Sequence, residues 1–128
     1  MMDIEIDFTD QAIRIEPCPV GSGVGAVLEF QGAVRNSEEG TPIAALIYEL
    51  YEPMAGQVIR KILQTLHESY PCRLAKVVHR HGVVPAGEVS IYVRIESAHR
   101  REGLRMMEEF MNLLKTDVPI WKTGSLPC

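Results

Sequence analysis

The sequence predicts an α+β fold in which an antiparallel sheet carries two helices on one face. Short segments with alternating apolar and polar residues, typical of half-buried strands, recur along the chain. Two longer segments repeat apolar residues every three to four positions, as amphipathic helices do. From residue 44 onward the predicted order is β-α-β-β-α-β, the split-βαβ order of ferredoxin-like folds. The first 43 residues add strands that the pattern does not place.

The first part of the chain contains three segments with strand character, at residues 3–8, 26–34 and 44–51. The spacing Gly21-x-Gly23-x-x-Ala26 resembles a dinucleotide-binding fingerprint, but such a fingerprint must follow a strand and open a helix. A strand-like run follows these glycines instead, so a simple turn is predicted. Residues 35–43 are expected to form a flexible polar loop.

The first helix is predicted to begin at Pro53, which suits a first helical turn, and to end near residue 70. Its apolar stripe repeats every four residues from Met54 to Leu66. Strands at 74–80 and 88–96 follow, joined by the hairpin-like link HGVVPAGE.

The second helix is expected to be capped by Ser97 and to stop before Pro119. Its buried stripe consists of Leu104, Met107, Met111 and Leu114. Residues 118–121 are predicted to form a final short strand.

Composition limits the class of protein. The 128 residues suit one domain, spanning 1–128, and 46% of them are hydrophobic, which argues against disorder. With 13 basic and 17 acidic side chains, the net charge of −4 disfavours nucleic-acid binding. No apolar run is long enough to span a membrane, and the acidic N-terminus is unlike a secretory signal. We therefore expect a cytoplasmic protein, in which three widely spaced cysteines remain free thiols.

Two groups of histidines are candidates for binding. His79 and His81 point to one face of a strand and could contribute to a metal site, although no third ligand has a fixed spacing to them. Solvated or hydrogen-bonded histidines are the simpler interpretation. His99, Arg100 and Arg101 lie where a strand meets a helix N-terminus, which favours an anion such as phosphate or carboxylate. A solvated helix start is the alternative.

Lys115 and Lys122 lie on either side of one proline-containing turn. A lysine held near apolar walls or another cation can donate or accept a proton near neutral pH. Ordinary exposed lysines remain the alternative. The run from Phe30 to Arg35 ends a strand in a positive charge, which is a weak signal alone.

Taken together, these segments resemble the large, catalytic subunit of molybdopterin synthase, the MoaE family. The resemblance rests on the collinear motifs FQGAVRN (30–36), YELYEPMA (48–55), HRHG (79–82), GEVSIYVRIESAHR (87–100) and LLKTDVPIWK (113–122). It implies an α+β fold of the α/β-hammerhead type. It also implies a sulfurtransferase that converts cyclic pyranopterin monophosphate into the dithiolene of molybdopterin, with no metal and no cofactor. The sulfur would come from the thiocarboxylate tail of a ubiquitin-like small subunit of the MoaD type, in a heterotetramer built on a homodimer.

The resemblance also assigns roles to individual residues. It makes Lys115 and Lys122 the active-site lysines. It makes Arg35, Phe30, Met111, His99 and Arg100 substrate-binding residues, with the histidine–arginine pair supplied by the neighbouring protomer. Cationic side chains of this kind would attract both a phosphate and a thiocarboxylate.

Two alternatives stay open at this point. Thr123 and Gly124 replace a basic residue and a glutamate usual in the family, so a divergent scaffold that binds the small subunit or dimerises without full catalysis is one. A metal-binding or anion-binding module using His79, His81 and His99 is the other.

Overall fold

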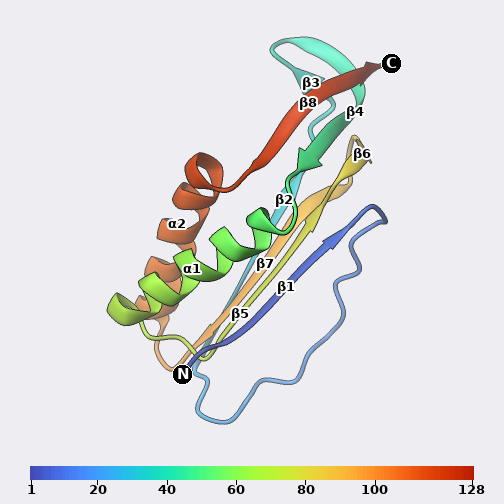
Figure 1. Ribbon diagram of the computed structural model, residues 1–128. Coiled ribbons are helices and arrows are strands. Elements are labelled where there is room, and N and C mark those ends of the chain that lie inside the picture. Colours follow the sequence, from blue (N-terminus) through green and yellow to red (C-terminus); the bar gives the residue numbers. More distant parts are fainter.

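The computed structural model describes residues 1–128 and arranges them in two sheets and two helices (Figure 1). The helices are α1 (Met54–Ser69) and α2 (Arg100–Asp117). The strands are β1 (Asp3–Thr9), β2 (Ala26–Ala33), β3 (Ser37–Glu38), β4 (Thr41–Leu50), β5 (Leu74–Arg80), β6 (Gly82–Pro85), β7 (Val89–Ser97) and β8 (Ile120–Pro127). Neither helix has the length and apolar character that crossing a bilayer requires.

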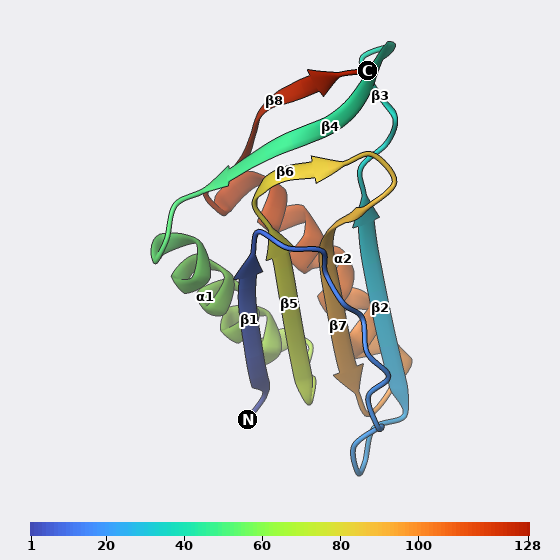
Figure 2. The same cartoon turned by 90° about the vertical axis from the view of Figure 1, so that its right-hand side faces the viewer.

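The first sheet has the strand order β1-β5-β7-β2 and carries both helices on one face (Figure 2). β1 runs parallel to β5, whereas β5 with β7 and β7 with β2 are antiparallel. The main core fills the space between this sheet and the helices. Its largest fully buried apolar side chains are Phe110, Ile59, Leu63, Ile95, Met106, Val77 and Val93. Each contributes about 1.5–3 kcal/mol through burial, which fixes α2 on the sheet.

The second sheet is built around β4 and lies across one end of the first (Figure 2). β4 pairs with β3, β6 and β8, in each case antiparallel. A small separate core of Val34, Ile43, Leu46 and Val84 holds this sheet together. The chain thus passes from α2, which packs on the first sheet, directly to β8, which belongs to the second sheet.

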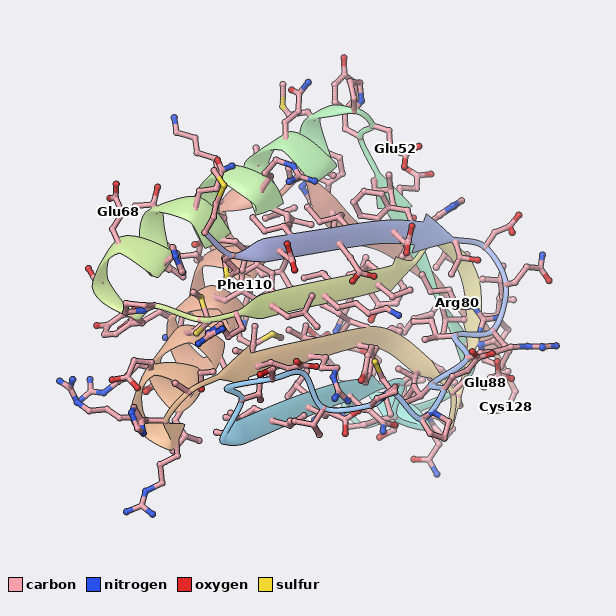
Figure 3. The ribbon with its side chains drawn as sticks, turned by 90° about the horizontal axis from the view of Figure 1, so that it is seen from below. Glu52, Glu68, Arg80, Glu88, Phe110 and Cys128 are labelled. Carbon is pink, nitrogen blue, oxygen red and sulfur yellow. The ribbon has the colours of Figure 1, made fainter.

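The segment 10–25, which has no regular secondary structure, crosses the face of the first sheet that the helices leave free (Figure 2). Polar side chains of β7 are buried on that face, where the Arg94 Nε donates to Glu96 at 2.8 Å. At the end of the same sheet, Arg80 forms an ion pair with Glu88 at 2.6 Å (Figure 3). Pairing of this kind is what buried charges require.

The α+β class is confirmed, as are the strands at 3–8 and 26–34 and the first helix. From residue 44 onward the predicted elements occur in the predicted order, with one additional strand, β6, between β5 and β7. The single sheet is not found as expected, because β4 and β8 form a second sheet while β1 and β2 complete the first. Alternation of side chains identifies a strand and its buried face, but it does not name the neighbouring strand.

Three local expectations are corrected. The link after residue 80 contains β6, which pairs with β4, and residues 35–43 contain β3 and a hairpin turn rather than a free loop. Ser97 does not cap α2: it ends β7, its hydroxyl donates to the His99 carbonyl at 2.7 Å, and His99 is the N-cap. The last strand runs over Ile120–Pro127, beyond the predicted 118–121, because β4 offers a long edge to pair with.

Candidate functional site

The connection from α2 to β8 presents two exposed lysines. Lys115 lies in the last turn of α2, and Lys122 is the third residue of β8. Between them Val118 is buried in the main core, with its carbonyl accepting from the Ile120 N–H at 2.8 Å. Because this short connection is anchored in the core, the backbone positions of the two lysines are fixed relative to each other.

Lys115 lies on the same face of α2 as the other predicted site residues of this helix, Met111 and Arg100. At about 100° per residue, positions 100, 104, 107, 111 and 115 fall within about 80° of one another. This face has Arg100 at one end and Lys115 at the other, with Leu104, Met107 and Met111 between them. Leu104 is 56% exposed, so the expectation that it belongs to the buried stripe of α2 is wrong; the buried residues of this helix are Gly103, Met106 and Phe110.

Phe30 lies on β2, the edge strand of the first sheet, on the face that the helices cover. Leu28, two residues earlier, packs against the core on that face, and Phe30 itself is 38% exposed. The glycine at position 32 gives the Phe30 ring its space. A Cβ there would lie 3.3 Å from the Phe30 ring and 2.7 Å from the Ile91 side chain. Sequence reasoning missed this role of Gly32, since a glycine shows no side-chain pattern.

Arg35 follows β2 directly after Val34, whose side chain is buried in the small core of the second sheet. The arginine side chain itself is exposed. Arg35 is thus carried by the junction between the two sheets, next to the hairpin that contains β3.

His99 and Arg100 lie at the opposite end of α2 from Lys115. With a rise of about 1.5 Å per residue, Arg100 and Lys115 are about 22 Å apart along the helix axis. The structure therefore places Met111 and Lys115 near the C-terminal end of α2, with Lys122 on β8 five residues after that end, and it leaves His99 and Arg100 at the other end of the helix. Within one chain these two groups do not form a single site.

The predicted cationic side chains have few carboxylates near them. Arg35, Arg100 and Lys115 form no ion pair, and the Lys122 ammonium has only Glu38 near it, at 3.8 Å. Exposed cations without carboxylate partners are free to attract an anionic ligand.

The chain's larger cavities lie elsewhere. Those of about 390 Å³ and 400 Å³ are lined by none of the residues that the resemblance assigns to the catalytic or substrate site. One of them lies at the end of β4 and is bordered by Tyr48, Glu49, Glu52 and His81. The larger cavities of a single chain therefore do not coincide with the residues assigned to the substrate site.

His79, on β5, and His81, directly after it, do not belong to a cluster of three metal-ligating side chains. His79 is buried, and its Nδ1 donates to the Arg80 carbonyl at 2.7 Å. Burial lowers the pKa of His79, so its ring is held neutral. No three side chains of the ligand types gather as a metal ion would require. His79 instead packs edge-on against the ring of Tyr48, a contact that the sequence alone did not reveal.

Comparisons with known proteins give a consistent result for the chain as a whole. A family model described as MoaE protein matches residues 3–117. The molybdopterin synthase catalytic subunit of Homo sapiens is 36% identical over 120 residues, covering 91% of this chain and 64% of the human protein. That of Rattus norvegicus is 43% identical over 98 residues, covering 77% of this chain and 49% of the rat protein. The chain thus spans less than two thirds of the length of these relatives.

Solved structures show the same fold. The crystal structure of molybdopterin synthase from Staphylococcus aureus has a TM-score of 0.80 and 28% identity, and covers 98% of this chain and 94% of that one. A complex of subunits 1 and 2 of molybdopterin-converting factor from Helicobacter pylori gives a TM-score of 0.71 at 20% identity, covering 98% of this chain and 89% of that one. The resemblance found in the motifs is confirmed, and the chain belongs to the MoaE family.

Proposed function

We propose that this chain is a catalytic subunit of molybdopterin synthase, a sulfurtransferase. Its substrates are cyclic pyranopterin monophosphate and the thiocarboxylate tail of a MoaD-type small subunit. The observation that carries the proposal is the pair of exposed lysines on either side of the α2–β8 connection, in a chain whose relatives are named as this subunit.

The chemistry needs both attraction and proton transfer. The phosphate of the pterin and the thiocarboxylate of the tail are anions, and Arg35, Lys115 and Lys122 lack strong carboxylate partners. As the sulfur bonds to the pterin side chain, an ammonium group can donate a proton to the oxygen that leaves. Phe30 and Met111 would supply apolar walls for the flat ring and the glycine tail.

We further propose that the complete site forms between two copies of the chain. Arg100 and Lys115 lie about 22 Å apart along α2, so one chain cannot bring both to one substrate. Two antiparallel α2 helices, packed through the face of Leu104, Met107 and Met111, would place the Arg100 of one copy beside the Lys115 of the other. The edge strand β2 lies on the same side of the molecule as this face, with Phe30 exposed on it.

A reconstituted turnover assay tests the activity. The chain is mixed with a thiocarboxylated small subunit and cyclic pyranopterin monophosphate, and the dithiolene product is measured. We expect product, and we expect Lys115→Ala to reduce its rate by at least about 100-fold, the usual range for loss of proton transfer. Lys61→Ala, an exposed lysine of α1, is the matched control and should leave the rate unchanged.

A rate for Lys115→Ala near that of the parent chain would contradict the role of Lys115. A parent chain that binds the small subunit but forms no product would contradict the enzymatic assignment and favour a scaffold.

A further inference from the structure

Tyr48 occupies a central place in the second sheet, directly beside Lys122. In the register of β4 it faces Gly82 of β6 on one side and Lys122 of β8 on the other. Residues directly opposite each other in an antiparallel pair project to the same face, with their Cβ atoms about 4.5–5.5 Å apart. The register therefore sets Tyr48 and Lys122 opposite each other on one face of the second sheet. On the other side of Tyr48, Gly82 has no side chain that could pack against the ring.

The Tyr48 ring is held from behind by the first sheet. It packs edge-on against the ring of His79, with centroids 5.5 Å apart and planes at 69°. His79 is only 6% exposed, and its hydrogen bond to the Arg80 carbonyl fixes the orientation of its imidazole. Tyr48 also packs on the small core that contains Leu46 and Val84. The ring is thus a rigid wall, and β5 carries its support.

Lys122, by contrast, has little else to direct it. The pairs run from Ile47 with Gly124 to Tyr48 with Lys122, so Thr123 is an extra residue and β8 is irregular there. Irregularities of this kind redirect the side chains beside them. The only carboxylate near the ammonium is Glu38 at 3.8 Å, and the Lys122 side chain is 52% exposed. The ring of Tyr48 is the one rigid surface that the register sets against its stem.

We propose that Tyr48 is a positioning residue for Lys122: its ring, supported by His79, holds the lysine stem so that the ammonium points toward the reacting groups. This inference rests on the proposed function, in which Lys122 acts on the pterin and the thiocarboxylate. The aromatic ring is the working part, because the Tyr48 hydroxyl forms no hydrogen bond within the chain. Tyr48→Phe should therefore preserve the positioning of Lys122, and Tyr48→Leu should abolish it.

The contact is tested first by NMR on the chain without substrate. In the parent chain and in Tyr48→Phe, ring-current shifts should move the Lys122 methylene protons upfield, and cross-relaxation to the ring should be visible. Both signals should vanish in Tyr48→Leu. Tyr51→Leu is the matched control, because this exposed tyrosine lies three residues further on, and it should leave the Lys122 signals unchanged.

The second measurement is turnover with thiocarboxylated small subunit and pterin substrate. Misplacing a catalytic group by about 1 Å costs about 100-fold, so Tyr48→Leu should lower kcat by about 10- to 100-fold. The small subunit's Kd should stay within about twofold, since the ring acts on the chemistry rather than on docking. Tyr48→Phe should restore kcat to within about threefold of the parent chain.

Three outcomes overturn the proposal. Lys122 signals without ring-current shifts in the parent chain would show that the contact is absent. An unchanged kcat in Tyr48→Leu would show that the contact does not position the lysine. Equal losses in Tyr48→Leu and Tyr48→Phe would assign the effect to the hydroxyl. A parent chain without turnover would instead overturn the proposed function, and the NMR measurement would still decide the contact.

Discussion

Mixing two inactive variants should restore activity if the site is shared between chains. In the proposed dimer each site takes Lys115 from one copy and Arg100 from the other. A dimer of one Lys115→Ala chain and one Arg100→Ala chain then has one site that lacks both residues and one site that lacks neither. Each variant alone has two defective sites, so activity appears only in the mixture.

The expected recovery follows from counting. Random reassociation of equal amounts makes about half of the dimers mixed, and each mixed dimer has one intact site of two, so the mixture should recover roughly a quarter of the parent activity. A mixed dimer isolated with two different affinity tags should recover roughly half. The assay is product formation at saturating small subunit and substrate, normalised to dimer concentration.

The sharpest control pairs Lys115→Ala with Lys122→Ala. Both lysines flank the same short connection of one chain, so both should serve the same site. Each site of that mixed dimer lacks one lysine, and no recovery is expected. Absence of recovery in the Lys115 and Arg100 mixture, with mixed dimers verified, would refute the shared site. Recovery in the two-lysine mixture would refute the assignment of both lysines to one site.

Three further results are expected. Gly25→Ala should lower the free energy of unfolding by about 1–3 kcal/mol, because its Cβ would lie 2.3 Å from the Ala98 carbonyl oxygen; equal urea midpoints for both chains would contradict this. Burial lowers the pKa of His79, so below about pH 6.5 the unfolded chain binds a proton that the folded chain does not. The free energy of unfolding should therefore fall as the pH drops through this range, and it should fall less in His79→Gln. Urea titrations at several pH values would measure this difference. Two of the three thiols should react quickly with a thiol reagent in the folded chain, because burial raises the pKa of Cys72 to about 11, and reaction of all three at one rate would contradict its burial.

The elements of this fold were predictable from the sequence, but their partners were not. The stripe from Met54 to Leu66 determines a helix whichever sheet lies beneath it. The alternation of side chains indicates a strand equally well in β1 and in β4. In the structure β1 joins the first sheet, parallel to β5, whereas β4 is the central strand of the second sheet. Side-chain alternation reports which face is buried, and strand neighbours depend on contacts between distant segments.

The site shows the same division. The cationic types at 35, 100, 115 and 122 were evident, because charged side chains at element ends are visible in the sequence. The supporting residues were not. Gly32 acts through the space it leaves for Phe30, and Tyr48 acts through a register between β4 and β8 that only the folded chain defines. Both are effects of position rather than of residue type.

The length of α2 connects the fold to the proposed function. Its 18 residues hold Arg100 and Lys115 apart on one face, and burial of Met106 and Phe110 on another face keeps the helix fixed to the sheet. A shorter helix would let one chain bring both cations together. In the proposed site, the observed length would leave each chain with two half-sites, one at each end of the face of Leu104, Met107 and Met111, and an antiparallel second copy would complete both. Dimerisation and catalysis would then depend on the same face of the same helix, so substitutions at Leu104 should weaken both together.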